Sequence, residues 1–142
     1  MKNTLKFVTI LGLLLAASAI PAAAQNKRML TLKAPFSFAV ENQTVPAGTY
    51  WITLQDGWLQ IQTAEGKAVA SVLTLPVSSQ KAEGKARVVF HQYHNRYFLS
   101  EVWLAASERG RQTLETREEQ RSRKLEAPQA IVVQLTTPDE GR

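Results

Sequence analysis

The feature that most constrains the fold of this chain is a regular alternation of short β-prone runs and clusters of turn-forming residues. The clusters separate the runs at intervals of about eight to twelve residues, which is typical of an antiparallel sandwich or barrel. The runs occupy positions 29–33, 36–40, 50–55, 58–63, 67–74, 87–93, 96–104 and 130–135. We therefore expect a mainly β protein, a small antiparallel barrel or sandwich of six to eight strands with one C-terminal helix and a closing strand.

The clearest pairing in the sequence is a hairpin that closes at Asp56-Gly57. A type I′ turn requires positive φ at both central residues, and an Asp-Gly pair between two alternating runs is the strongest short hairpin signal. This closure pairs Gln55 with Trp58, Leu54 with Leu59, Ile52 with Ile61 and Trp51 with Gln62. The core face then carries Tyr50, Ile52, Leu54, Leu59 and Ile61. The opposite, mostly polar face carries Trp51, Thr53, Gln55, Trp58, Gln60 and Gln62.

A second turn at 64–66 predicts how the next strand pairs. The sequence Ala-Glu-Gly suits a three-residue loop with Gly66 in the left-handed conformation. This closure sets Ile61 opposite Val69 and keeps Val69 and Leu73 on the core face. We therefore expect a three-stranded meander in this part of the chain.

The hairpin expected over 87–104 is apolar on both faces. One face carries Val88, Phe90, Tyr97, Leu99 and Trp103, and the other carries Val89, Phe98, Val102 and Leu104. A strand pair that is apolar on both sides is usually covered on both. We therefore expect the later helix or a partner chain to pack on the outer side of this hairpin.

The segment 107–125 interrupts the β pattern, because charged residues and good helix formers dominate it. It predicts a helix over about 113–125, mostly solvated, with Leu114 and Leu125 as its apolar contacts. Six basic and five acidic residues give positions 108–126 a net charge of only +1. A solvated face explains this pattern, and attraction to anionic lipid is the alternative. The tail 138–142 is expected to be disordered.

The N-terminal 24 residues have the three parts of a secretory signal peptide. Lys2 and Lys6 precede an apolar run at 7–20, and Ala22 and Ala24 place small side chains where signal peptidase cleaves. Cleavage after Ala24 would leave one β domain over 25–137, without a transmembrane segment, exported to the periplasm or the medium. An uncleaved membrane anchor is the alternative.

Four segments carry a resemblance to a known family. They are FSFAV at 36–40, VPAGTY at 45–50, ASVLTLPV at 70–77 and VFHQYHNRYFLS at 89–100, followed by Trp103. Together they resemble a family of small exported bacterial β proteins to which no function has been assigned. The resemblance implies export and a β architecture, and it brings no catalytic residue.

The residue types that carry most catalytic chemistry are scarce. The chain has no cysteine, and its two histidines, His91 and His94, should point to opposite faces of a strand, which does not suit a metal site. It has no Gly-x-Ser-x-Gly elbow and no glycine-rich phosphate loop. We therefore assign no catalytic residue, metal or cofactor. A small hydrolase using Glu101 or His91 remains an alternative.

The polar face of the first hairpin is the candidate binding surface. Two flat indoles flanked by amides would suit the rings of a glycan, so the predicted ligand-binding residues are Trp51, Thr53, Trp58, Gln60 and Gln62. Coverage of these tryptophans by another element is the competing explanation. An apolar ligand would instead use the inward Tyr50, Ile52, Leu59 and Ile61. The function expected is a non-catalytic envelope protein binding a glycan or protein partner, and not nucleic acid. A structural or assembly protein acting through a homodimer is the alternative.

Overall fold

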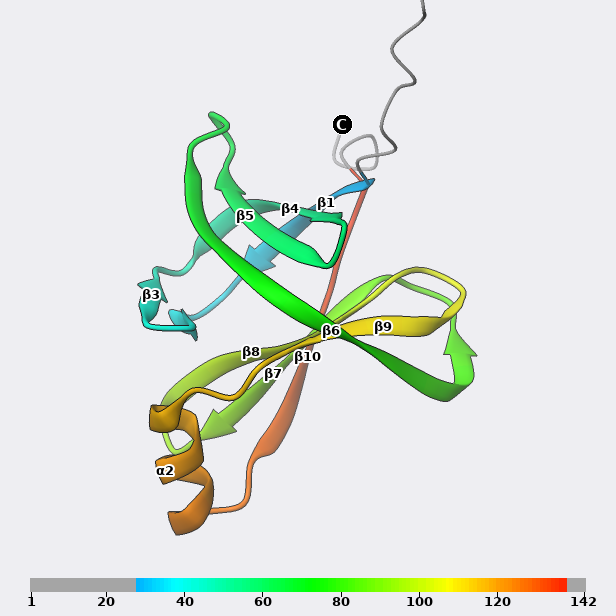
Figure 1. The fold of residues 1–142 in the computed structure, drawn as a ribbon. Coiled ribbons are helices and arrows are strands. Elements are labelled where there is room, and N and C mark those ends of the chain that lie inside the picture. The colour runs from blue at the N-terminus through cyan, green and yellow to red at the C-terminus, as the bar shows by residue number, and fades with distance from the viewer. Residues whose placement is uncertain (1–27, 138–142) are drawn as a thin grey trace, which may run out of the picture.

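The computed structural model describes residues 28–137, which form ten strands and one helix (Figure 1). The predicted signal peptide and the tail 138–142 lie outside the described residues. The first five strands are β1 (Arg28–Ala34), β2 (Phe38–Val40), β3 (Gln43–Val45), β4 (Gly48–Gln55) and β5 (Trp58–Thr63). They are followed by β6 (Ala68–Glu83), β7 (Arg87–Tyr93), β8 (Arg96–Trp103), β9 (Ser107–Thr113), α2 (Arg117–Leu125) and β10 (Gln129–Gln134).

The strands form two sheets that share the long strand β6. In the first sheet the order is β1-β4-β5-β6, and in the second β6 continues into β9 and β8. On one edge of β8, the second sheet continues through β7 to β10. On the other edge of β8, the β2–β3 hairpin is attached by a parallel bridge between Ala39 and Phe98. The sheet does not close into a barrel. Of the two expected architectures, the chain therefore adopts the sandwich-like one (Figure 1).

The core lies between the inner faces of the two sheets. Fully buried side chains of the first sheet are Leu32, Ile52, Leu59 and Ile61, and those of the second include Phe38, Val88, Phe90 and Val102. Each such burial contributes roughly 1.5–3 kcal/mol. The expectation of an apolar ligand among Tyr50, Ile52, Leu59 and Ile61 is therefore wrong, because these side chains are packed into the core.

The β4–β5 hairpin forms as the sequence predicts. Gln55 pairs with Trp58 and Ile52 with Ile61. Asp56 and Gly57 have φ values of 50° and 83°, so both central residues of the turn have the positive φ that this turn type requires.

The pairing of β5 with β6 differs from the expectation by one residue. Ile61 lies opposite Ala70, not Val69, because a β-bulge at Val69 inserts an extra residue into β6. A shift of one residue moves every side chain to the other face. The core face therefore carries Ala70 and Val72, whereas Leu73 is exposed.

A second bulge, at Ser100, changes the faces of the β7–β8 hairpin. Phe90 pairs with Leu99, but Val89 already pairs with Glu101. Val102 therefore joins the core cluster, and Trp103 turns to the outer face, the reverse of the expected arrangement. The outer face is covered in part by α2, the first of the two alternatives that the sequence left open.

The helix begins later than expected. Residues 107–113 form strand β9, which pairs with both β6 and β8, and α2 starts only after its N-cap Thr116. The expected apolar contacts of the helix are also wrong, because Leu114 and Leu125 are exposed and its buried residue is Glu119. In the described part of the chain, no helix has the length and apolarity needed to cross a membrane.

Candidate functional site

The five predicted ligand-binding residues lie on the outer face of the first sheet, away from the core. The register places Trp51 opposite Gln62, Thr53 opposite Gln60, and Gln55 opposite Trp58. Trp58 lies next to the hairpin turn and is 51% exposed, so about half of its side chain is open to solvent.

A shallow cavity of about 260 Å³ brings three of these five residues together. Its lining comprises Thr53, Gln55, Asp56, Trp58, Gln60 and Ser71. Trp51 and Gln62 are not part of the lining, and Trp51 is partly buried. The sequence placed Gln55 on this face, but Ser71 was not foreseen, because only the bulge in β6 sets it opposite Gln60.

The turn beside this cavity is held in place by two residues of neighbouring strands. The Thr74 amide and hydroxyl donate to the carbonyl oxygen of Gly57 at 2.8 and 2.6 Å. Arg111 Nε donates to Thr74 Oγ1 at 2.8 Å, and Arg111 Nη2 donates to the Thr74 carbonyl at 2.6 Å. Thr74 is also the residue at which β6 leaves β5 and begins to pair with β9. The position of Asp56 and Trp58 is therefore fixed by the junction of the two sheets.

The chemistry of the cavity combines a flat apolar surface with many hydrogen-bonding groups. Gln55 and Gln60 supply amides, each with a donor and an acceptor end, and Ser71 supplies a hydroxyl, whereas Thr53 is buried at 7% exposure. Asp56 adds a carboxylate that accepts hydrogen bonds. An aromatic face beside such groups suits a ligand with both C–H and O–H surfaces, which is the character of a sugar ring.

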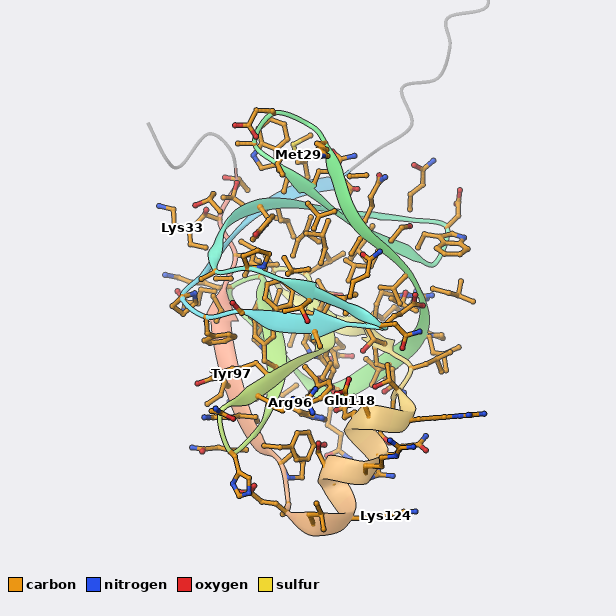
Figure 2. All side chains as sticks on the ribbon, turned by 90° about the vertical axis from the view of Figure 1, so that its left-hand side faces the viewer. Met29, Lys33, Arg96, Tyr97, Glu118 and Lys124 are labelled. Carbon is orange, nitrogen blue, oxygen red and sulfur yellow. The ribbon has the colours of Figure 1, made fainter. Side chains whose placement is uncertain are left out.

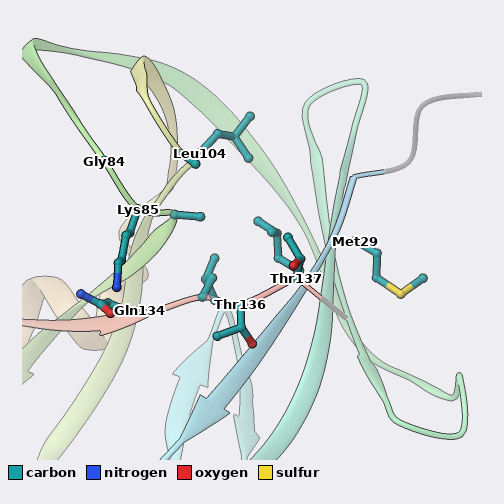
Figure 3. Close-up of a pocket in the computed structure, with 11 residues that line it drawn as sticks. Met29, Gly84, Lys85, Leu104, Gln134, Thr136 and Thr137 are labelled. Carbon is teal, nitrogen blue, oxygen red and sulfur yellow. The ribbon is translucent and has the colours of Figure 1, made fainter. Parts of the chain in front are cut away.

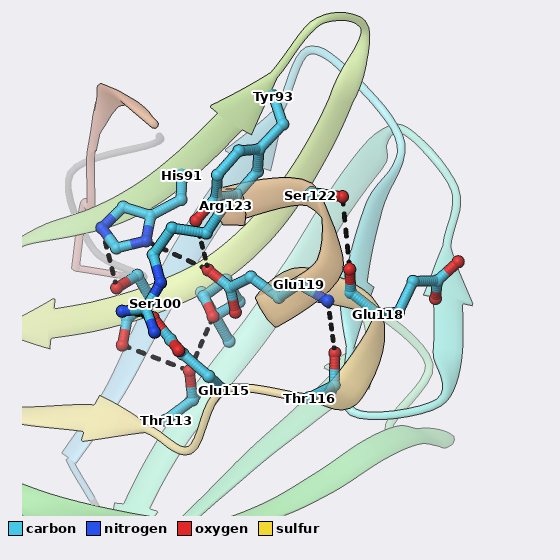
Figure 4. Close-up of polar contacts among 11 residues, drawn as sticks. His91, Tyr93, Ser100, Thr113, Glu115, Thr116, Glu118, Glu119, Ser122 and Arg123 are labelled. Atoms are coloured by element: carbon cyan, nitrogen blue, oxygen red, sulfur yellow. Dashed lines mark hydrogen bonds and ion pairs between the residues drawn. The ribbon is translucent and has the colours of Figure 1, made fainter. Parts of the chain in front are cut away.

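A second polar cluster connects the helix to the β7–β8 hairpin (Figure 4). His91 Nδ1 lies 3.1 Å from Glu119 Oε1, and His91 Nε2 lies 3.3 Å from Ser100 Oγ. The Tyr93 hydroxyl donates to Glu119 Oε1 at 3.4 Å. The N-cap Thr116 accepts a hydrogen bond from the Glu119 amide, which fixes the first turn of the helix above the hairpin.

Glu119 shifts the titration of both aromatic neighbours. Its hydrogen bond and its charge raise the pKa of His91 above 6.5, against the opposing effect of burial, and the charges of Glu101 and Glu115 act in the same direction. Burial, aided by the Glu119 charge, raises the pKa of Tyr93 to about 12. Contact with Glu119 therefore lets His91 keep its proton to a higher pH than a free imidazole would.

The Ser100–His91–Glu119 chain has the connectivity of a Ser–His–acid triad. Its three members come from β8, β7 and α2, so the same contacts join the helix to the β7–β8 hairpin. The second residue expected for a hydrolase, Glu101, accepts a hydrogen bond from the indole of Trp103 at 2.7 Å. We therefore interpret the cluster as the attachment of α2 to the sheet.

Two further ion pairs join the same two elements. Arg96 pairs with Glu118 near the hairpin tip (Figure 2), and His94 Nδ1 lies 2.8 Å from Glu126 Oε2. Both pairs are largely solvent-exposed, so each contributes little by itself. They fix the orientation of a helix that has almost no apolar face.

Among residues 28–137, no three His, Cys, Asp or Glu side chains lie close enough together to hold a metal ion. No family model, no curated protein and no solved structure matches the chain. The geometry of its own residues is therefore the basis for a functional proposal.

Proposed function

We propose that this chain is an exported, non-catalytic envelope protein that binds a glycan on the outer face of the β4–β5 hairpin. The observation that carries the proposal is the half-exposed indole of Trp58 beside a cavity lined with amides, hydroxyls and one carboxylate. The C–H face of a sugar ring stacks on the indole, and its hydroxyls bond to Gln60, Ser71 and Asp56. Trp58 is half-exposed and lies outside the core cluster, whereas a tryptophan side chain is usually highly buried.

The binding site is tested by calorimetric titration of the purified exported protein with envelope polysaccharides and their oligosaccharide fragments. We expect Trp58→Ala to abolish binding and Trp58→Tyr to retain part of it, because tyrosine keeps an aromatic face. Leu125→Ala is the control, since Leu125 is 88% exposed on the distant helix. Binding by Trp58→Ala equal to that of the unmodified protein would contradict the proposal.

Export is supported by the sequence of residues 1–24 alone. We expect the protein recovered from the periplasm or medium to begin at Gln25, which mass spectrometry of the intact chain measures. A chain that retains Met1 in the membrane fraction would instead indicate an uncleaved anchor.

Assembly with a second copy is the second candidate function, and one observation favours it. Trp58 pairs with Leu73 across β5 and β6, and both are exposed, as is Leu75 two residues further along. These three side chains form an apolar strip of the kind that mediates contacts between proteins. Analytical ultracentrifugation of the unmodified protein and of Leu73→Gln distinguishes assembly from glycan binding. A dimer formed through this strip would cover the glycan site, and Leu73→Gln should weaken that dimer.

A further inference from the structure

A second cavity, separate from the Trp58 site, lies at the open end of the sandwich, where β1 approaches the end of β10 (Figure 3). Its volume is about 450 Å³, within the range of roughly 300–1,000 Å³ that small-molecule sites occupy. The walls come from the start of β1, the turn between β6 and β7, the end of β8 and the segment after β10.

The backbone around this cavity is fixed by hydrogen bonds between the sheets. Thr31 and Thr136 exchange two backbone hydrogen bonds of 2.7 and 3.1 Å, and the Leu135 amide donates to the Ala86 carbonyl at 2.8 Å. The Thr31–Thr136 bridge joins β1, the edge strand of the first sheet, to the segment that follows β10 in the second sheet. The cavity therefore exists before any ligand binds, which lowers the entropic cost of binding.

The lining is apolar with one charged group. Leu30, Ala86, Leu104 and Leu135 are among the apolar residues, and Lys85 is the charged residue of the lining. Lys85 and Gln134 both line the cavity and are both exposed, and in Figure 3 their side chains extend toward the same side of it, so an ammonium and an amide are available at its rim. No carboxylate of the lining neutralises the ammonium. The site is thus complementary to a molecule with an apolar tail and an anionic head.

We propose that this cavity binds a fatty acid of medium chain length. The acyl chain occupies the apolar part between Leu30, Leu104 and Leu135, and the carboxylate pairs with the ammonium of Lys85 and accepts a hydrogen bond from Gln134. A charge-assisted hydrogen bond of this kind is stronger than a neutral one, so the anion is preferred over the alcohol of the same length. The site does not depend on the glycan site and goes beyond the proposed function.

The test is calorimetric titration of the exported protein with decanoate and, separately, with decanol, both below their aggregation concentrations. We expect saturable binding of decanoate with one site per chain. Lys85→Gln should weaken decanoate binding about tenfold, which corresponds to the loss of one charge-assisted hydrogen bond, and should leave decanol binding unchanged. Lys81→Gln, an exposed lysine of β6 outside the cavity, is the matched control.

A second variant tests the apolar part independently. Leu104→Trp fills the cavity and should abolish binding of both ligands, whereas Leu114→Trp, at an exposed position elsewhere, should not. Equal decanoate affinity in Lys85→Gln and the unmodified protein, or no saturable binding, would overturn the proposal. If Leu104→Trp does not fold, Lys85→Gln alone decides. Trp58→Ala should bind decanoate normally, so failure of the glycan site and failure of this site are distinguishable.

Discussion

At the scale of single residues, the VPAGTY segment at 45–50 has a structural role. In the VPAGTY segment, the Tyr50 hydroxyl donates to the Pro46 carbonyl at 2.7 Å, while the ring packs at the core edge-to-face with Phe38. The tyrosine therefore closes the entry to β4 by bonding four residues back. Such a segment specifies a turn and the start of a strand.

The first prediction concerns this hydrogen bond. Tyr50→Phe leaves the Pro46 carbonyl without its donor and should lower the free energy of unfolding by about 1 kcal/mol. Urea denaturation followed by circular dichroism measures the change. Tyr97→Phe, which keeps the ring that stacks on Phe36 at 3.7 Å, is the control and should change stability less. An equal loss in both variants would contradict the role assigned to Tyr50.

The second prediction concerns Gly110, where β9 passes beneath Trp103. A Cβ atom at Gly110 would lie 2.7 Å from two atoms of the Trp103 ring and 3.0 Å from the Val102 carbonyl oxygen. Gly110→Ala should therefore destabilise the protein by roughly 1–3 kcal/mol, the usual effect of overpacking. Gly84→Ala is the matched control, since nothing lies within 4 Å of its Cβ position. A midpoint of thermal unfolding that is the same for both variants would show that the indole moves away without cost.

At the scale of elements, α2 is attached to the sheet by charge instead of an apolar face. Its buried residue is a carboxylate, Glu119, which binds His91 and Tyr93, and its exposed pairs reach Arg96 and His94. A buried carboxylate that loses its partner is costly. The docking of this helix should therefore depend on the protonation of His91.

The third prediction is the pH dependence that follows. The folded state raises the pKa of His91 above its unfolded value of 6.5, so the pair contributes its full stability below about pH 6.5. This contribution is lost as the pH rises through the folded pKa. The unfolding free energy should therefore be higher at pH 6 than at pH 8.5, as measured by urea denaturation.

Two variants isolate the source of this pH dependence. Glu119→Gln removes the carboxylate that raises the pKa and should reduce the difference between pH 6 and pH 8.5. Leu125→Ala should leave the difference in place, because Leu125 carries no titratable group and is 88% exposed on the same helix. An unchanged difference in Glu119→Gln would show that another group titrates.

At the scale of the whole molecule, β6 makes the two sheets interdependent. The first half of β6 pairs with β5 and the second half pairs with β9. The change of partner strand occurs at Thr74, which is hydrogen-bonded both to Arg111 and to the β4–β5 turn. The inner faces of the two sheets also share one core. Neither sheet retains a buried face or a complete set of strand partners without the other.

The fourth prediction is that the two sheets unfold together. A variant with Trp51→Phe and Trp58→Phe reports through Trp103 in the second sheet, and one with Trp58→Phe and Trp103→Phe reports through Trp51 in the first. In each variant, the fluorescence midpoint in urea should coincide with the midpoint measured by circular dichroism of the same sample, as in a two-state transition. A tryptophan midpoint that precedes the midpoint from circular dichroism would show that one sheet opens independently.

The sequence by itself determined the local structure of the molecule. Alternation gave the strands β4, β5, β7 and β8 to within a residue or two, and Asp56-Gly57 determined the register of the first hairpin, because local φ preferences and a period of two act within a few residues. For the same reason Trp58, Thr53 and Gln60 were assigned to one polar face. Placing these three residues on one face requires only the register of a single hairpin.

Tertiary structure alone decided the rest. The bulges at Val69 and Ser100 are not visible in the sequence alternation, because an inserted residue is stabilised by partners on another strand. The first bulge places Ser71 in the candidate site, and the second turns Trp103 away from the core face. Strand β9 has a polar, charged sequence without alternation, and it is extended because it pairs with β6 and β8. The cavity at Lys85 lies where β1 and the segment after β10 meet at the Thr31–Thr136 bridge, a contact between residues more than a hundred positions apart.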